Sequence, residues 1–288
     1  MAIPFWLLAM DMESVHVSRV SLAWDHLAIG NLPALIRNRR RTGSHEERLL
    51  YSRPLRNGGA RPWSVRRINA ILQMLRSPTR YLEIGVAEGY TLESVSATQR
   101  TGVEPAPRFD ISRLPKGVKL FPVTSDEFFA SAEGAQHFDV VFLDGLHTFE
   151  QTYQDLLNSF NLASPSAVLI DDTVPCDEPS SMPDQLASKA LRREHGLPGW
   201  FWHGEVWKVV TCVARHHREL SFRTIMGPGN PQTLVWPNGS APLVRAGDSD
   251  LRAIAELAYR DAFQGGVVPE SFHADNEGTA LAVLKATL

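Results

Sequence analysis

The sequence predicts an α/β fold in which a doubly wound, mostly parallel sheet carries helices on both faces. From Trp63 onward, short apolar segments alternate with stretches of helical periodicity, a pattern typical of βαβ units. A glycine-containing turn follows the first apolar segment, and acidic residues follow two later ones. Because ligands bind at the carboxyl ends of strands in such sheets, these same segments indicate where a site would lie.

The predicted strands are short and rich in Val, Ile, Leu and Phe, as expected of strands buried on both faces. The five parallel ones are 81–84, 101–103, 119–123, 138–143 and 167–170, with helices at 65–75, 91–96, 126–131 and 149–162. Segments 205–213, 220–226 and 233–236 are predicted to close the sheet, which we expect to be seven-stranded with an antiparallel closing strand. The Gly and Pro residues of 227–230 predict a tight turn.

The chain is predicted to consist of one catalytic core with additions at both ends. Residues 1–60 are expected to form a helical extension and connector, and residues 61–240 the core, with a lid-like insertion at 173–204. Residues 241–288 are predicted to be a C-terminal helical extension that contains an amphipathic helix at 250–263.

Composition narrows the class of partner. The 29 Lys and Arg residues nearly balance 32 acidic ones, and the net charge of -3 favours a small-molecule partner over nucleic acid or a membrane surface. Two distant cysteines argue against a disulfide framework and favour the cytoplasm. The apolar run at 3–10 is too short for a spanning helix and lacks a preceding basic region, so we also expect no signal peptide.

The most informative segment is the turn that contains Glu83, Gly85, Gly89 and Thr91. Glycine allows a sharp turn and a close approach of the backbone to a ligand, and the following helix offers its N-terminus. The spacing E-x-G-x-x-x-G-x-T lacks the G-x-G-x-x-G pattern of dinucleotide-binding folds. A nicotinamide cofactor is therefore disfavoured.

Carboxylates end two further predicted strands. Asp144 follows the strand at 138–143, and Asp171 and Asp172 follow the one at 167–170. Carboxylates brought close together repel one another unless they share a proton or bind a cation, and hard oxygen ligands suit Mg²⁺. A metal site is predicted, with a proton-sharing or solvated acidic cluster as the alternative.

The glycine turn resembles the first motif of the class I, S-adenosylmethionine-dependent methyltransferases, which have a Rossmann-like sheet. The resemblance implies that Glu83, Gly85 and Gly89 surround the amino acid part of the cofactor and that Glu104 binds its ribose. It places Ser125 and Asp126 at the adenine, and we expect Thr91 and Asp144 to line the cofactor as well. The alternatives are that Glu104 is a surface carboxylate and that Ser125 only caps a helix starting at Asp126.

The pattern Asp144-Gly145-x-His147 with a downstream Asp171-Asp172 is similar to the metal-dependent subfamily of cephamycin-pathway and macrolide sugar O-methyltransferases. The match covers residues 81–173. It implies that Asp144, Asp171 and Asp172 bind Mg²⁺ and that His147 is the catalytic base. A further acidic ligand that some relatives supply from a separate loop is not evident in the sequence. A structural role in the turn is the alternative for His147. For the two adjacent carboxylates, the alternative is that Asp171 caps the structure and Asp172 alone binds the metal.

The insertion holds an aromatic cluster, Trp200-Phe201-Trp202, followed by His203. The cluster could stack on an acceptor ring or simply pack, and packing is favoured. Lys208 could reach an acidic substrate group or pair with Glu205.

The predicted function is O-methylation of a hydroxyl on a small molecule, such as a sugar or secondary metabolite, by a homo-oligomeric enzyme. One alternative is a catalytically silent binding or scaffold protein with the same fold. A dinucleotide-dependent oxidoreductase is the other, and the missing glycine pattern disfavours it.

Overall fold

The computed structural model describes residues 63–76, 78–198 and 201–288. The predictions for the N-terminal extension, its helix and its apolar run therefore lie outside the described residues. Trp200 also lies outside them.

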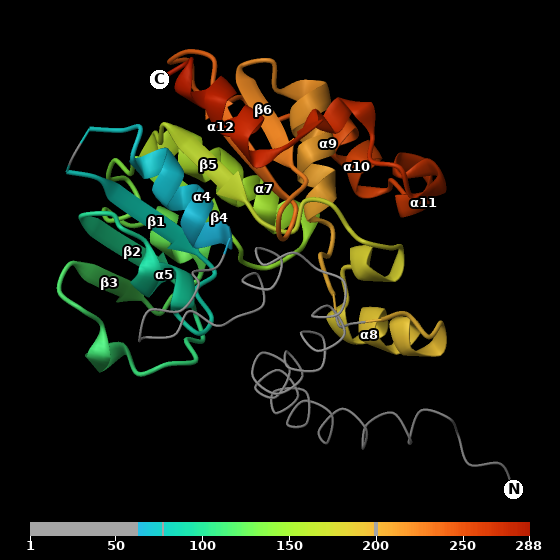
Figure 1. Ribbon diagram of the computed structural model, residues 1–288, viewed down its shortest axis with the longest axis horizontal. Helices are drawn as coiled ribbons and strands as arrows, with labels where there is room; N and C mark the ends of the chain where they lie inside the picture. Colours follow the sequence, from blue (N-terminus) through green and yellow to red (C-terminus); the bar gives the residue numbers. More distant parts are fainter. Residues whose placement is uncertain (1–62, 77, 199–200) are drawn as a thin grey trace, which may run out of the picture. The chain divides into compact units, whose positions relative to one another are not determined.

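An eight-stranded sheet runs in the order β3-β2-β1-β4-β5-β7-β6-β8 (Figure 1). Strands β1 to β5 are parallel, whereas β7 runs antiparallel to both of its neighbours. The strand order reverses between β1 and β4, which confirms the doubly wound, mostly parallel α/β prediction. The strands are β1 Arg80–Ile84, β2 Gln99–Val103, β3 Val118–Phe121, β4 Val140–Leu143, β5 Ala167–Ile170, β6 Leu220–Ile225, β7 Gln232–Pro237 and β8 Ala274–Asp275.

Helices connect these strands and cover both faces of the sheet. They are α4 Trp63–Leu72, α5 Tyr90–Ser94, α6 Ser125–Phe129, α7 Phe149–Asn158, α8 Gln185–Glu194, α9 Val206–His216, α10 Asp248–Ala255, α11 Tyr259–Ala262 and α12 Glu277–Lys285. A π-helical turn, Ser159–Ala163, extends α7. Short 3-10 turns occur at Ile111–Arg113, Pro179–Ser181, Gln264–Gly266 and Glu270–Phe272.

Two apolar clusters hold these layers together, one on each face of the sheet. Alternate side chains of the strands point to opposite faces, so Tyr81 packs with α4, α5 and α12 while Leu82 packs with α6, α7 and α9. Leu251 and Ile254 of α10 join the second cluster, and Leu284 of α12 joins the first. The residues beyond position 240 are therefore part of the packed core layers.

Most predicted elements are confirmed within a few residues. The five parallel strands, the helices that follow them and the two antiparallel strands occupy the predicted segments. A helix within the insertion is α8, which starts after Asp184, whose carboxylate accepts a hydrogen bond from the backbone N–H of Ala187.

Three details of the prediction are wrong. Segment 205–213, predicted as a strand, forms α9, because a short apolar run suits a buried helix as well as a buried strand. The single helix predicted at 250–263 is two short helices, α10 and α11. The sheet has eight strands instead of seven, since the two-residue β8 pairs with the edge of β6.

No helix among the described residues is both long enough and apolar enough to cross a membrane.

Candidate functional site

The glycine turn joins β1 to α5 and touches the loop after β4. Gly85 has a φ of 86°, and Gly89 has a φ of 80°, conformations that favour glycine. A Cβ on Gly85 would lie 2.1 Å from the carbonyl oxygen of Asp144. Because β1 and β4 pair in register up to Ile84 and Leu143, the backbone of the turn lies directly against Asp144.

Glu83 is the last but one residue of β1, just before this turn, and is 2% exposed. The hydroxyl of Tyr81 donates a hydrogen bond to its carboxylate at 2.8 Å. Burial raises the pKa of Glu83 well above its ordinary value, with Tyr81 lowering it and Asp144 raising it further. No cationic side chain in the described ranges pairs with Glu83. The carboxyl group of Glu83 therefore resists ionisation unless a positive charge comes to lie beside it.

Glu104 follows β2, and its carboxylate is bound to backbone amides. Oε2 accepts from the N–H groups of Val86 and Ala87 at 3.2 and 3.1 Å, and Oε1 accepts from Ala106 at 2.9 Å. The carboxylate therefore holds the glycine turn in shape and is more than a solvated surface group. Thr91 lies in the first turn of α5, close behind the glycine turn.

The helix after β3 starts one residue earlier than predicted. Thr124 is its N-cap and forms a capping box with Glu127, so Ser125 does not have the capping role that the sequence left open. The side-chain amide of Gln151 binds both Ser125 Oγ and Asp126 Oδ1, at 3.1 and 3.2 Å. These contacts join the start of α6 to α7.

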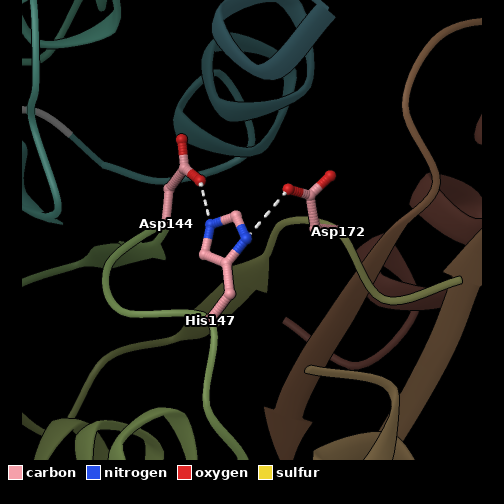
Figure 2. Close-up of side chains that lie close together, drawn as sticks. All are labelled: Asp144, His147 and Asp172. Atoms are coloured by element: carbon pink, nitrogen blue, oxygen red, sulfur yellow. Dashed lines mark ion pairs between the residues drawn. The ribbon is translucent and has the colours of Figure 1, made fainter. Parts of the chain in front are cut away.

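A cluster of ionisable side chains lies at the ends of two neighbouring strands. It consists of Asp144 after β4, His147 in the following loop and Asp172 after β5. Figure 2 shows His147 between the two carboxylates, with one ring nitrogen facing each. Nε2 lies 3.4 Å from Asp144 Oδ1, and Nδ1 lies 3.4 Å from Asp172 Oδ2. One potential ligand atom from each residue lies within 4.8 Å of the others. The three side chains could hold a metal ion.

The protonation of this cluster depends on its charges. Burial disfavours the charged imidazole, but hydrogen bonding to Asp144 and the charges of Asp172 and Asp144 outweigh it and raise the pKa of His147 to about 9. Burial raises the pKa of the Asp144 carboxyl, which His147 in turn lowers. The imidazolium thus supplies positive charge between the carboxylates, in the position where a cation would be stabilised.

Asp171 does not join the Asp144–His147–Asp172 cluster. Its Oδ1 accepts from the backbone N–H of Asp172 at 2.9 Å and from the side-chain amides of Asn230 and Gln232 at 2.7 and 3.1 Å. Burial, together with the charges of Asp144 and Asp172, raises the pKa of Asp171 well above its ordinary value. The two adjacent carboxylates therefore have different surroundings.

The end of the insertion packs against His147. The ring of Trp202 stacks on the imidazole, with centroids 4.7 Å apart and planes at 14°. Its indole N–H donates to the carbonyl of Met182 at 2.7 Å. Gly204 has a φ of 59°, and a Cβ there would lie 2.1 Å from the carbonyl oxygen of His147. The backbone N–H of Glu205 donates to that same carbonyl at 2.8 Å.

His203 is a residue that the sequence did not single out as functional. Its Nε2 lies 3.8 Å from Asp172 Oδ1, and its buried Nδ1 has no hydrogen-bond partner in the described part of the chain. Burial lowers the pKa of His203. Lys208, by contrast, pairs with Glu205 at 2.6 Å and donates to the carbonyl of Ala255, which favours the pairing alternative of the sequence.

A cavity of about 640 Å³ lies between α7 and the segment that includes α10. Its lining includes Tyr153, Gln154, Arg245 and Leu251, and none of the three residues of the Asp144–His147–Asp172 cluster. Position at the carboxyl ends of β4 and β5, together with the charge arrangement, makes the cluster the better candidate for the reaction site.

Residues 82–173 match a family model described as a methyltransferase domain. The match covers about a third of the chain, and nearly the same range as the resemblance found in the sequence. It includes the glycine turn, Asp144, His147, Asp171 and Asp172. This segment is therefore similar to a methyltransferase domain.

Comparison with curated proteins finds no significant match. Among solved structures, a candidate O-methyltransferase from Klebsiella pneumoniae is 15% identical, with 73% of this chain and 90% of that one covered and a TM-score of 0.43. A candidate caffeoyl-CoA O-methyltransferase from Staphylococcus aureus is 14% identical, with 72% and 99% covered and a TM-score of 0.42. Fibrillarin from Aeropyrum pernix, with natively bound S-adenosyl-L-methionine, is 12% identical, with 60% and 75% covered and a TM-score of 0.34. Similarity this remote carries no argument about substrate.

Proposed function

We propose that this protein is an S-adenosylmethionine-dependent methyltransferase that transfers the methyl group to a hydroxyl of a small molecule. The observation that carries the proposal is the position of His147 between two carboxylates, at the carboxyl ends of β4 and β5 and beside the glycine turn. A base, an acidic pair and a close-approach turn are thus brought to one edge of the sheet.

The glycine turn and the strand ends fit the cofactor. S-adenosylmethionine, when bound, supplies a methyl group on a positively charged sulfur. Buried Glu83, which pairs with no cation in the described ranges, would stabilise the cationic amino group, and Gly85 keeps the backbone of the turn close to Asp144. Glu104 would bind the ribose hydroxyls while it holds the turn, and Thr91, Asp144, Ser125 and Asp126 would line the rest of the site.

His147 is proposed as the general base that accepts the proton of the acceptor hydroxyl. An imidazole must be neutral to accept a proton, whereas the carboxylates around His147 raise its pKa to about 9. Neutralising those carboxylates would lower the pKa of His147 towards its ordinary range. The base role therefore requires either alkaline conditions or positive charge at Asp144 and Asp172.

The donor set of the Asp144–His147–Asp172 cluster fits a divalent cation. Mg²⁺, when bound, supplies charge neutralisation and acidifies a hydroxyl that coordinates it. Asp144 and Asp172 would be its protein ligands, and these oxygen donors suit a hard cation. Asp171, which the sequence also suggested as a ligand, would act through its hydrogen bonds instead of direct coordination unless its side chain turns.

The acceptor is proposed to be a small hydroxylated molecule, such as a sugar or a secondary metabolite. Trp202 stacks on His147 and forms an apolar wall next to the proposed base. Such a wall would exclude water from the hydroxyl and orient a ring-shaped acceptor. The enzyme is proposed to work as a homo-oligomer.

The first experiment is a calorimetric titration with S-adenosylmethionine and with its demethylated product, each with and without Mg²⁺. Binding of both would support the cofactor, and methyl transfer from labelled S-adenosylmethionine to a panel of hydroxylated acceptors would then test the reaction. Absence of binding would favour a silent scaffold, and binding of a nicotinamide dinucleotide instead would favour an oxidoreductase.

The role of His147 is tested by His147→Asn. Removing a general base should lower kcat by about 100-fold or more while the affinity for S-adenosylmethionine stays the same. His195→Asn, an exposed histidine at the end of α8, is the matched control and should keep wild-type kcat. Equal kcat in His147→Asn and wild type would refute the assignment of the base.

A further inference from the structure

The turn between β6 and β7 reaches the candidate site from a distant part of the sequence. Asn230 lies at the end of this turn, and its side-chain amide donates hydrogen bonds to Asp171 Oδ1 at 2.7 Å and to Asp172 Oδ1. An amide nitrogen carries two hydrogens, so it can serve one carboxylate with each. The Asn230 amide therefore bridges two adjacent, mutually repelling carboxylates.

This bridge leaves the second oxygen of Asp172 directed at His147. Asn230 binds Oδ1, whereas Oδ2 lies 3.4 Å from His147 Nδ1. Asp172 itself has a φ of 56°, in the left-handed region that is uncommon for residues other than glycine. Strained backbone of this kind persists only when surrounding contacts hold it in place.

A buried arginine fixes the position of the turn. Arg67 of α4 is 0% exposed and donates to the backbone carbonyls of Pro228 and Asn230 at 2.8 and 2.7 Å. It also donates to the side chain of Gln232 at 2.7 Å and pairs with Glu277 at 3.3 Å. Because Pro228, Asn230 and Gln232 lie more than 160 residues from Arg67 in the sequence, these bonds tie the turn to α4.

The same turn is tied to the loop that carries the two carboxylates. The amide of Gln232 donates to Asp171 at 3.1 Å, and the backbone N–H of Thr173 donates to the carbonyl of Pro231 at 3.3 Å. The turn and the start of β7 thus bind the side chain of Asp171 and the backbone that follows Asp172. Asp171 is occupied by these bonds, and Asp172 is left as the carboxylate that faces His147.

We propose that Asn230 is a positioning residue of the reaction site, which orients Asp172 towards His147 by binding both Asp171 and Asp172. The proposal rests on the proposed methyltransferase function, because the benefit of a fixed Asp172 is a correctly placed cation and base. Asn230 would act through Asp172, by its hydrogen bond to that carboxylate, and not through a contact of its own with acceptor or cofactor. Arg67 and Gln232 support it by fixing the turn and Asp171.

The test uses Asn230→Ala, which removes the bridge, and Asn230→Asp, which keeps the shape but replaces the donor with a third carboxylate. We expect kcat to fall by about 10- to 100-fold in both variants, the range typical when a group that orients a metal ligand is lost. The KM for S-adenosylmethionine should stay unchanged, because the glycine turn is not affected. A general loss of folded protein would instead lower the active fraction and the melting temperature.

Asn238→Ala is the matched control. Asn238 follows β7 at the opposite end of the same hairpin, where its amide donates to the carbonyl of Arg218 at 3.0 Å. This variant also removes an amide hydrogen bond of the hairpin, but it should keep wild-type kcat. A similar fall in kcat in Asn238→Ala would show that the hairpin affects activity only through stability, and the proposal would be wrong.

Crystal structures of wild type and Asn230→Ala provide a readout that does not depend on activity. In the variant, the Asp172 carboxylate should rotate away from His147. If wild type transfers no methyl group and yet the carboxylate rotates, the positioning role stands and the proposed function fails. If wild type is active, but the carboxylate stays in place and kcat is unchanged in both Asn230 variants, the positioning role is overturned.

Discussion

Replacing Asp155 with asparagine should make the protein more stable at neutral pH. Asp155 lies on α7 and is 3% exposed, and its carboxylate accepts a hydrogen bond from the Gln151 amide at 3.1 Å. Burial raises its pKa from an ordinary 3.8 to about 6, although hydrogen bonds from Ser125 and Gln151 act in the opposite direction. The folded protein therefore carries a carboxyl group that resists ionisation.

The sign of the effect follows from comparing the two states. As pH rises, Asp155 loses its proton first in the unfolded chain, where its pKa is lower, so ionisation favours unfolding. The contribution of the protonated Asp155 carboxyl group to the free energy of unfolding is fully present below pH 3.8 and is lost as pH rises through about 6. A difference of about 2 pKa units corresponds to a loss of about 3 kcal/mol in the free energy of unfolding.

Urea unfolding of wild type and Asp155→Asn at several pH values measures this effect. The asparagine cannot ionise, so the free-energy difference between variant and wild type should change in favour of the variant by about 2 kcal/mol between pH 4.5 and pH 7.5. The comparison with wild type removes the contribution of the other buried carboxyl groups. Asn also retains an oxygen that can accept from Gln151.

Asp126→Asn is a second variant for this experiment. Asp126 binds the same Gln151 amide at 3.2 Å, and its charge is one of the causes that raise the pKa of Asp155. Removing that charge should leave the pH dependence of stability with the same sign but make it smaller than in wild type. A free-energy difference between Asp155→Asn and wild type that stays constant with pH would refute the argument that burial opposes the ionisation of Asp155.

Two further predictions concern glycines whose φ is positive and whose Cβ would meet backbone atoms. Gly85→Ala should lower the free energy of unfolding by at least about 1 kcal/mol and weaken S-adenosylmethionine binding, because a Cβ would lie 2.1 Å from the Asp144 carbonyl oxygen. Thermal unfolding and calorimetric titration measure the two effects. An unchanged melting temperature together with an unchanged affinity would contradict the prediction. Gly204→Ala should destabilise the protein by a similar amount and lower kcat, because it displaces the insertion from His147. Thermal unfolding and steady-state kinetics test this prediction. Gly196→Ala is the control for positive φ alone, because no atom lies within 4 Å of the added Cβ there.

The positions of the strand ends could be predicted from the sequence because the signals are local. The apolar segment before Asp144 and the one before Asp171 and Asp172 mark buried strands, and parallel strands bring their carboxyl ends to one edge. The glycine turn after β1 is similarly local, since its backbone conformation needs glycine at positions 85 and 89. These signals were sufficient to predict that Asp144 and His147 lie near the carboxylates after β5.

The sequence left open that Asp171 has a structural role while Asp172 alone binds the metal, but it could not decide how the two residues divide their roles. This division depends on the left-handed backbone at Asp172 and on Asn230, which lies 58 residues further along the chain. In the sequence, 227–230 indicated a turn and nothing more. Arg67 gave no functional signal either, because an arginine in a predicted helix is expected to be exposed.

The sequence by itself determined the class of fold, the glycine turn and the acidic residues at the strand ends, because hydrophobic periodicity and backbone requirements are properties of neighbouring residues. Only the tertiary structure decided that 205–213 is the helix α9, that Trp202 stacks on His147, and that Asp172 faces the imidazole while Asp171 is held by Asn230. Each of these depends on burial and hydrogen bonding between distant segments, and the energy of such contacts is defined only once the chain has folded.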